Sequence, residues 1–178
     1  PSTRTRMSFQ SAMQRMGGSV IGFSDVSTSS IKKGESLPDT IKIISGYCDI
    51  IVMRHPEEGS VEQAANDSSV PVINAGDGPH EHPTQTILDL YTIMKEKGKL
   101  AGLKVGFVGD LKYGRTVHSL AYLLSQFKGV RIIFVSPPAF QVPEDLKTLL
   151  RAKDIAFRET ADLQGTIGEV DVLYQTRV

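Results

Sequence analysis

The sequence predicts an α/β protein built from two doubly wound domains, each with a mainly parallel sheet flanked by helices, joined by a long helix. The first observation behind this prediction is that short apolar runs alternate with amphipathic stretches along all 178 residues. Strands and helices in alternation require crossover connections, which produce parallel sheets. The second observation is the position of residues that end or start helices. Gly98 follows a helical pattern, and Pro83 and Pro143 stand where first turns begin.

The individual elements follow from the periodicity of apolar residues. Short apolar runs predict strands, in chain order, at Val20–Phe23, Ile50–Met53, Val70–Ile73, Val105–Val108, Arg131–Val135 and Val172–Tyr174. Apolar residues spaced three and four apart predict helices at Met7–Met16, Leu37–Tyr47, Ser60–Asn66, Pro83–Lys97, Thr116–Phe127 and Glu144–Lys153.

The domain boundary is expected directly after the long helix Pro83–Lys97. That helix ends in the polar stretch 95–99, and a new strand followed by glycine begins at Lys104. We therefore expect one domain at 1–98 and a second at 99–178, with the ligand at the carboxyl ends of the strands. Because the chain opens on Pro1 inside a motif and stops at Val178 directly after another, we expect a piece of a longer protein.

The composition excludes several classes of protein. The 20 basic residues balance the 20 acidic ones, which argues against general binding of nucleic acid. No apolar run reaches the length of a membrane span, and no signal-peptide pattern opens the chain. The one cysteine, Cys48, cannot form an internal disulfide, so we expect a reducing, cytoplasmic location and a buried structural thiol.

The stretch from Ser2 to Arg6 predicts a phosphate site. It places hydroxyls and guanidinium groups directly before a helical pattern, where unpaired N–H groups and the helix dipole favour an anion. Taken alone, the same stretch could be an ordinary Ser/Thr cap on a surface helix.

Further cations gather where the predicted parallel strands end. A neutral chain thus concentrates positive charge near one cleft, with Arg4, Arg6, Lys32, Lys33, Arg54, Arg115 and Arg177. This pattern indicates one or two substrates with several negative charges. The alternatives are that Arg54 pairs with a nearby glutamate and that Lys32-Lys33 belongs to a solvated loop.

Two other motifs allow competing interpretations. His80 and His82 could bind a metal, but no cluster of carboxylates or thiols supports one, so we expect no metal. His82 instead opens a helix, which keeps an imidazole neutral and able to donate a hydrogen bond. The stretch Gly109–Thr116 has P-loop spacing, but Arg115 replaces the lysine, and a guanidinium suits a carboxylate better.

Taken together, the motifs make the chain similar to the aspartate and ornithine carbamoyltransferase family. The resemblance rests on 2–6, 32–35, 54–56, 82–85, 109–119 and 174–178, in order along essentially the whole chain. Lys-Lys-Gly-Glu and Arg-His-Pro resemble the aspartate branch. The resemblance implies transfer of a carbamoyl group from carbamoyl phosphate to the amine of L-aspartate, in pyrimidine synthesis and without a cofactor.

The resemblance also implies roles for individual residues. The phosphate would be held by Ser2, Thr3, Arg4, Thr5 and Arg54. The carbonyl would be polarised by Thr5, Arg54 and His82, and Gln85 would hold the carbamoyl amide. Arg115 and Arg177 would bind the aspartate carboxylates, and Lys33 would also contact the aspartate. Lys33, with Ser29 or Ser30, would reach in from a neighbouring subunit, which makes a homotrimer the minimal active unit.

Three alternatives remain open from the sequence. The acceptor could be another amine such as ornithine, the chain could be a catalytically silent assembly partner, or it could be a P-loop nucleotide binder. Regulatory subunits or fused enzymes of the pyrimidine pathway are compatible partners.

Overall fold

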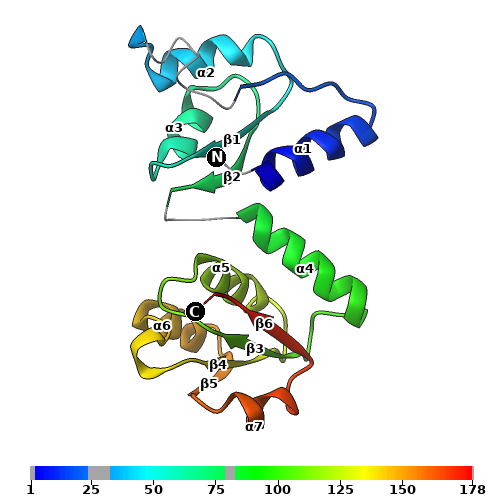
Figure 1. The fold of residues 1–178 in the computed structure, drawn as a ribbon, viewed down its shortest axis with the longest axis vertical. Helices are drawn as coiled ribbons and strands as arrows, with labels where there is room; N and C mark the ends of the chain where they lie inside the picture. Colours follow the sequence, from blue (N-terminus) through cyan, green and yellow to red (C-terminus); the bar gives the residue numbers. More distant parts are fainter. Residues whose placement is uncertain (1–2, 24–32, 79–82, 178) are drawn as a thin grey trace. The chain divides into compact units, whose positions relative to one another are not determined.

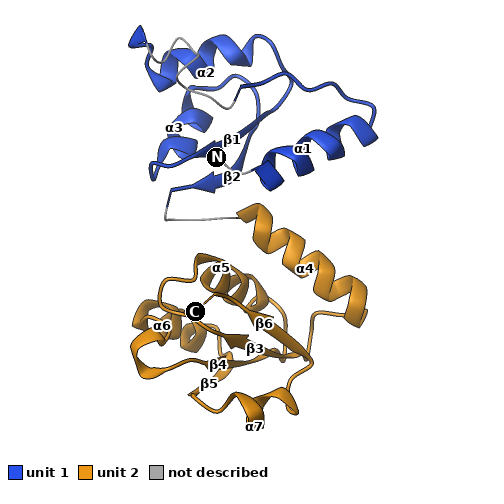
Figure 2. Cartoon of the chain, viewed as in Figure 1, with its two compact units in different colours: residues 1–80 blue, residues 81–178 orange. Residues whose placement is uncertain are grey.

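The computed structural model describes residues 3–23, 33–78 and 83–177 of the chain. These residues fall into two compact units, 1–80 and 81–178, which Figure 2 colours separately. The long helix α4 (Pro83–Lys97) groups with the second unit, whereas the sequence placed the domain boundary after it. To which functional domain α4 belongs stays a prediction.

The first unit contains three helices and a small parallel sheet in its described part. In chain order these are α1 (Thr3–Arg15), α2 (Leu37–Ser45), β1 (Ile51–His55), α3 (Ser60–Asp67) and β2 (Val72–Asp77) (Figure 1). The strands β1 and β2 pair in parallel, with Ile51 opposite Val72. The crossover helix α3 packs against both strands.

The described residues of the first unit contain a small hydrophobic cluster. Its buried members are Ile41 from α2, Ile51 from β1 and Ala64 from α3. Cys48 packs against this cluster, and its thiol donates to the carbonyl of Ile44 at 3.3 Å. The sequence predicted a buried thiol, but Cys48 is only half-buried, because it lies at the edge of this small cluster.

The described part of the second unit contains a four-stranded parallel sheet. After α4 come β3 (Lys104–Val108), α5 (Arg115–Leu124), β4 (Arg131–Val135), η3 (Pro138–Phe140), α6 (Glu144–Ala152), β5 (Ala156–Thr160), α7 (Leu163–Ile167) and β6 (Val172–Gln175). The strand order is β5-β4-β3-β6, and every pairing is parallel.

Helices cover both faces of this sheet. Val105 and Phe107 of β3 join one buried cluster with side chains from α4, α5 and α6. Gly106 points to the opposite face, where an added Cβ would meet Thr166 of α7 at 3.7 Å. The prediction of parallel sheets flanked by helices is therefore confirmed in the described part of the chain.

The elements predicted from the sequence need correction at four places. The run Val20–Phe23 is not a strand, because no described strand pairs with it, and Ile21 and Phe23 are exposed. The sequence missed β5, whose Arg158 and Glu159 interrupt its apolar run, and it missed the five-residue helix α7. Helix α1 begins at Thr3, four residues before the predicted start at Met7.

Candidate functional site

The first group of site residues lies where α1 begins. Thr3, Arg4 and Thr5 occupy the first turn of α1, and this turn contains no acidic residue. The positive end of the helix dipole and the Arg4 guanidinium therefore add to each other there. Such a turn attracts an anion. Ser2 lies outside the described residues.

Arg54 joins this turn to the sheet of the first unit. Its Nη1 donates to Oγ1 of Thr5 at 3.2 Å, linking positions 49 residues apart in the chain. Arg54 is the penultimate residue of β1, so the strand extends beyond the predicted end at Met53. The bond brings two residues of the predicted phosphate site together at the carboxyl end of β1.

A glycine on the neighbouring strand makes room for the Arg54 side chain. Gly76 of β2 has a φ of +132°, and an added Cβ would lie 3.3 Å from both Cζ and Nε of Arg54. That is closer than almost all Cβ contacts, so the guanidinium lies directly against the backbone of β2. Gly76 lies in β2 beyond the predicted strand end at Ile73, and no sequence pattern indicated this supporting role.

The carboxylate of Asp77 fixes the same edge of the sheet. Asp77 is buried and accepts from the N–H groups of Gly59, at 3.0 Å, and Val61, at 3.5 Å. These contacts attach the start of α3 to the end of β2. In addition, the N–H of Gly78 donates to the carbonyl of His55 at 2.9 Å. The backbone around Arg54 is thus held by hydrogen bonds from both sides.

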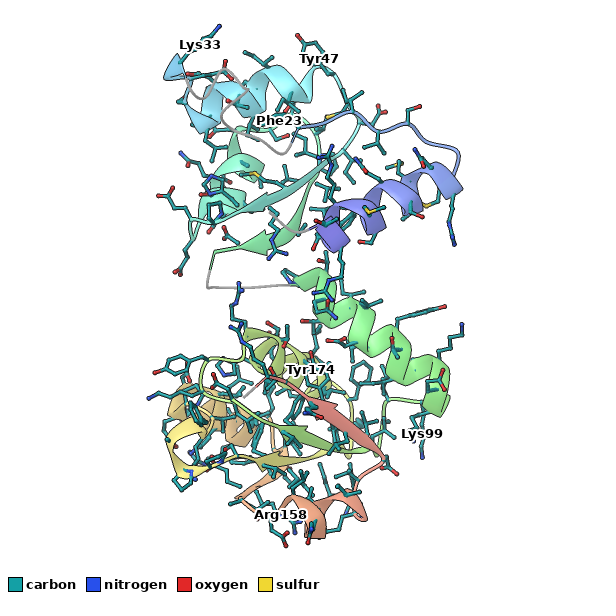
Figure 3. All side chains as sticks on the ribbon, viewed as in Figure 1. Phe23, Lys33, Tyr47, Lys99, Arg158 and Tyr174 are labelled. Atoms are coloured by element: carbon teal, nitrogen blue, oxygen red, sulfur yellow. The ribbon has the colours of Figure 1, made fainter. Side chains whose placement is uncertain are left out.

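Lys33 lies elsewhere in the first unit. It is exposed and precedes α2, and Figure 3 shows it projecting outward from the unit. Ser29, Ser30 and Lys32 lie outside the described residues, as does His82.

The second unit contains a pocket that brings Arg115 and Arg177 together. Arg115 is the first residue of α5, and Arg177 follows the end of β6 by two residues. Both line a pocket of about 200 Å³ with Asp110, Tyr113, Gly114, Thr116 and Thr176. Pockets for drug-sized ligands span about 300–1,000 Å³, so this one suits a ligand of amino-acid size. Two guanidinium groups in it suit carboxylates.

The two arginines converge because β3 and β6 are adjacent parallel strands. Thr176 N–H donates to the carbonyl of Val108, and Asp110 N–H donates to the carbonyl of Arg177, both at 2.9 Å. Gly109 lies between these contacts with a φ of +121°. An added Cβ there would lie 2.8 Å from the oxygen of Thr176 and 2.9 Å from that of Arg177. Only glycine fits this close approach of two chain segments.

The loop before Arg115 does not have the properties of a P-loop. A P-loop directs its backbone N–H groups at phosphate. Here those of Gly109, Asp110 and Leu111 donate to carbonyl oxygens of the same unit. Those of Lys112 and Tyr113 donate to Oδ1 of Asp110 at 3.2 and 3.0 Å. With five successive N–H groups occupied, the loop offers no phosphate cradle.

Gln85 lies in the first turn of α4, and its amide is held by a neighbour on the same helix. Its Nε2 donates to Oδ1 of Asp89 at 2.9 Å. Oδ2 of Asp89 accepts from the hydroxyl of Tyr174 at 3.0 Å. No sequence motif indicated a role for Asp89. The i,i+4 spacing from Gln85 was the signal that could have identified it.

The described residues contain no group of three or more His, Cys, Asp or Glu side chains that could hold a metal ion. Within the same ranges, no helix has both the length and the apolarity needed to cross a membrane.

The chain is similar to known proteins over its whole length. Residues 1–95 match the carbamoyl-phosphate-binding domain of the aspartate/ornithine carbamoyltransferase family. The aspartate carbamoyltransferase catalytic subunit of Methanocaldococcus jannaschii is 58% identical over 178 residues, and that of Clostridium novyi is 54% identical. Each comparison covers all of this chain and 58% of the relative, so the chain spans little more than half of their length.

Solved structures show the same similarity in three dimensions. The catalytic subunit of M. jannaschii aspartate transcarbamoylase aligns over 99% of this chain and 58% of its own, with a TM-score of 0.95 and 58% identity. The aspartate transcarbamoylase of Trypanosoma cruzi in complex with carbamoyl phosphate and aspartate aligns over 100% of this chain and 61% of its own. Its TM-score is 0.89 at 43% identity. The chain belongs to the aspartate/ornithine carbamoyltransferase family.

Proposed function

We propose that these residues form a large part of the active site of an aspartate carbamoyltransferase. The reaction transfers the carbamoyl group of carbamoyl phosphate to the α-amine of L-aspartate, giving N-carbamoyl-L-aspartate and phosphate. The observation that carries the proposal is the pocket in which Arg115 and Arg177 meet. The relatives named above, including one solved with carbamoyl phosphate and aspartate, support it.

Carbamoyl phosphate is assigned to the end of β1 and the start of α1. Arg54 and the first turn of α1 offer two kinds of donor, guanidinium and hydroxyl, around the hydrogen bond between Arg54 and Thr5. In the proposal the phosphate is held by Ser2, Thr3, Arg4, Thr5 and Arg54, with Ser29 and Lys33 contributed by a neighbouring subunit. Gln85 holds the carbamoyl amide.

The chemistry requires stabilisation of charge rather than a protein nucleophile. The nitrogen of aspartate attacks the carbamoyl carbon, and the carbonyl oxygen becomes an oxyanion in a tetrahedral intermediate. The bond from that carbon to the phosphate oxygen then breaks, and the leaving phosphate takes the proton from the amine. Thr5, Arg54 and His82 donate hydrogen bonds to the oxyanion, while the arginines and Lys33 neutralise the phosphate.

The pocket favours aspartate over ornithine as the acceptor. Aspartate has two carboxylates, which matches the two guanidinium groups of Arg115 and Arg177. The side chain of ornithine ends in a cation, which two arginines in one small pocket repel.

The assembly and cellular setting are further parts of the proposal. Lys33 projects outward from its own unit, which supports a homotrimer in which it completes the site of the next subunit. The product feeds pyrimidine synthesis in the cytoplasm. Regulatory subunits or fused enzymes of the same pathway remain compatible with this assembly.

An assay with radiolabelled carbamoyl phosphate tests the proposal. The natural polypeptide that contains these 178 residues is supplied with aspartate and, in parallel, with ornithine. Labelled carbamoyl aspartate is the expected product. Transfer to ornithine alone would assign the chain to the other branch, and transfer to neither amine would contradict an enzymatic role.

A further inference from the structure

Three polar side chains of the second unit form a chain of two hydrogen bonds, and Thr116 lies at its end. Gln85 and Asp89 belong to α4, Tyr174 to β6 and Thr116 to α5. Gln85 donates to one carboxylate oxygen of Asp89 at 2.9 Å, and Tyr174 donates to the other at 3.0 Å. Thr116 lies beside the hydroxyl of Tyr174 and interacts with it in the direction that lowers the pKa of the phenol. Asp89 and Tyr174 are 85 residues apart, so the chain joins separate elements.

The carboxylate of Asp89 determines the direction of every bond in this chain. An ionised carboxylate only accepts hydrogen bonds. The amide group of Gln85 that faces it must therefore be the NH₂, and the carbonyl oxygen of Gln85 is turned away from Asp89. Similarly, the Tyr174 hydroxyl must donate its proton to Asp89, so on the side of Thr116 it can only accept.

The surroundings of Tyr174 keep this chain in one arrangement. Its ring packs against Phe107 of the core, with ring centroids 5.5 Å apart. Burial and the neighbouring Asp89 carboxylate raise the pKa of Tyr174, against the opposing effect of Thr116. The phenol therefore keeps its proton at neutral pH and remains a donor. Figure 3 labels Tyr174 on β6.

The two ends of the chain lie at groups that the proposed function uses. Gln85 is the residue assigned to the carbamoyl amide. Thr116 lines the pocket that contains Arg115 and Arg177. A carbamoyl NH₂ group is a donor, so it needs an acceptor from the protein. The carbonyl oxygen of Gln85 provides one only if the amide has the orientation that Asp89 imposes.

We infer that Asp89 is a positioning residue that fixes the amide of Gln85 and connects it, through Tyr174 and Thr116, to the wall of the arginine pocket. The inference rests on the proposed function, because it requires the carbonyl oxygen of Gln85 to accept a hydrogen bond from the carbamoyl NH₂ group. Its physical basis is the pair of hydrogen bonds on one carboxylate. A local Gln–Asp pair on a helix surface would lack the bond to Tyr174.

The decisive variant is Asp89→Asn, which keeps the shape but adds a donor. An asparagine NH₂ that faces Gln85 favours the flipped amide, which would turn a donor toward the carbamoyl group. In the natural polypeptide we expect the KM for carbamoyl phosphate to rise about tenfold, as for a buried donor left without its acceptor. Glu96→Gln, at the exposed far end of α4, is the charge-matched control and should leave this KM unchanged.

A double-mutant cycle separates positioning from a structural role. If Asp89 acts through Gln85, the double variant Asp89→Asn/Gln85→Ala binds carbamoyl phosphate no more weakly than Gln85→Ala alone. If the weakening of carbamoyl-phosphate binding in the double variant equals the product of the two single effects, the inference is overturned. A wild-type KM in a folded Asp89→Asn protein would overturn it as well. Lower melting temperature with unchanged KM values would also overturn it, because that result describes a purely structural residue.

Tyr174→Phe keeps the test valid should Asp89→Asn fail to fold. It retains the bond between Gln85 and Asp89 but removes the connection to Thr116. We expect a rise of about two- to tenfold in the KM for aspartate, with a smaller change for carbamoyl phosphate. Tyr91→Phe, on an exposed residue of α4, is its control. Unchanged KM values in Tyr174→Phe would overturn the connection to the pocket.

The two possible failures can be told apart. If the wild-type protein transfers no carbamoyl group to aspartate, the proposed function fails. If the wild-type protein is active and Gln85→Ala is impaired, but Asp89→Asn and Tyr174→Phe behave normally, only the present inference fails.

Discussion

The two arginine-bearing edges of this protein are built alike but supported unequally. In each unit a site arginine lies near the end of a parallel strand, next to a glycine with positive φ: Arg54 beside Gly76, and Arg177 beside Gly109. The second unit surrounds its edge with a buried cluster of sixteen described residues, against three in the first. In addition, α1 contains no buried residue.

This difference indicates how far each edge is organised by its own unit. Arg115 and Arg177 already line one pocket, and a rigid core reduces the cost of ordering a ligand there. The first unit holds Arg54 to α1 through a hydrogen bond to Thr5, while Lys33 projects away. We therefore expect the edge at Arg54, to which carbamoyl phosphate is assigned in the proposal, to depend on other segments or subunits far more than the arginine pocket does.

The largest expected effect comes from sharing of the site between subunits. In the natural polypeptide, Lys33→Ala and Arg54→Ala should each abolish most activity. Randomly mixed trimers should regain activity in about one quarter of their sites, where an intact Arg54 meets an intact Lys33 from the next chain. Steady-state assays before and after dissociation and reassembly measure this recovery.

Each variant reassembled alone is the control for that experiment and should stay inactive. If native mass spectrometry confirms mixed trimers and activity still does not return, the site is not shared. The first unit would then be as self-contained as the second.

The next effect concerns the close approach in the second unit. Gly109→Ala should lower the free energy of unfolding by about 2–4 kcal/mol, because the new Cβ is strained at positive φ and collides with two backbone oxygens. Urea denaturation measures the loss. The control is Gly168→Ala, where φ is −73° and no atom lies within 4 Å of the added Cβ. Equal stability of the two variants would contradict the argument.

A smaller effect is expected when the pocket arginines become lysines. Lys cannot form the bidentate pair with a carboxylate. Arg115→Lys or Arg177→Lys should therefore raise the KM for aspartate by about 10- to 100-fold, with little change for carbamoyl phosphate. Initial rates with each substrate varied in turn measure both values. A larger rise in the KM for carbamoyl phosphate than in that for aspartate would show that the two substrates are assigned to the wrong edges.

Local sequence patterns were sufficient to predict the features that depend on the alternation of strands and helices. The parallel sheets followed from the order of apolar runs, and the approach of Arg115 to Arg177 followed from parallel strands. The contact of Asp89 with Tyr174 could not be predicted, because nothing local relates residues 85 positions apart. The run Val20–Phe23 was predicted as a strand on apolarity alone, although a strand also needs a pairing partner.

The smallest predicted effect tests whether Gly76 supports Arg54 as Gly109 supports Arg177. In Gly76→Ala the new Cβ would lie 3.3 Å from the Arg54 guanidinium, and the end of a flexible side chain can move away. We expect only a displaced arginine, with a rise of about two- to tenfold in the KM for carbamoyl phosphate. The matched control is Gly59→Ala, where φ is +83° but no atom lies within 4 Å of the added Cβ. Alanine is strained at positive φ in both variants, yet only Gly76→Ala should raise the KM for carbamoyl phosphate. Equal KM values would mean that backbone strain, not contact with Arg54, explains the glycine, and the likeness between the two edges would not extend to their glycines.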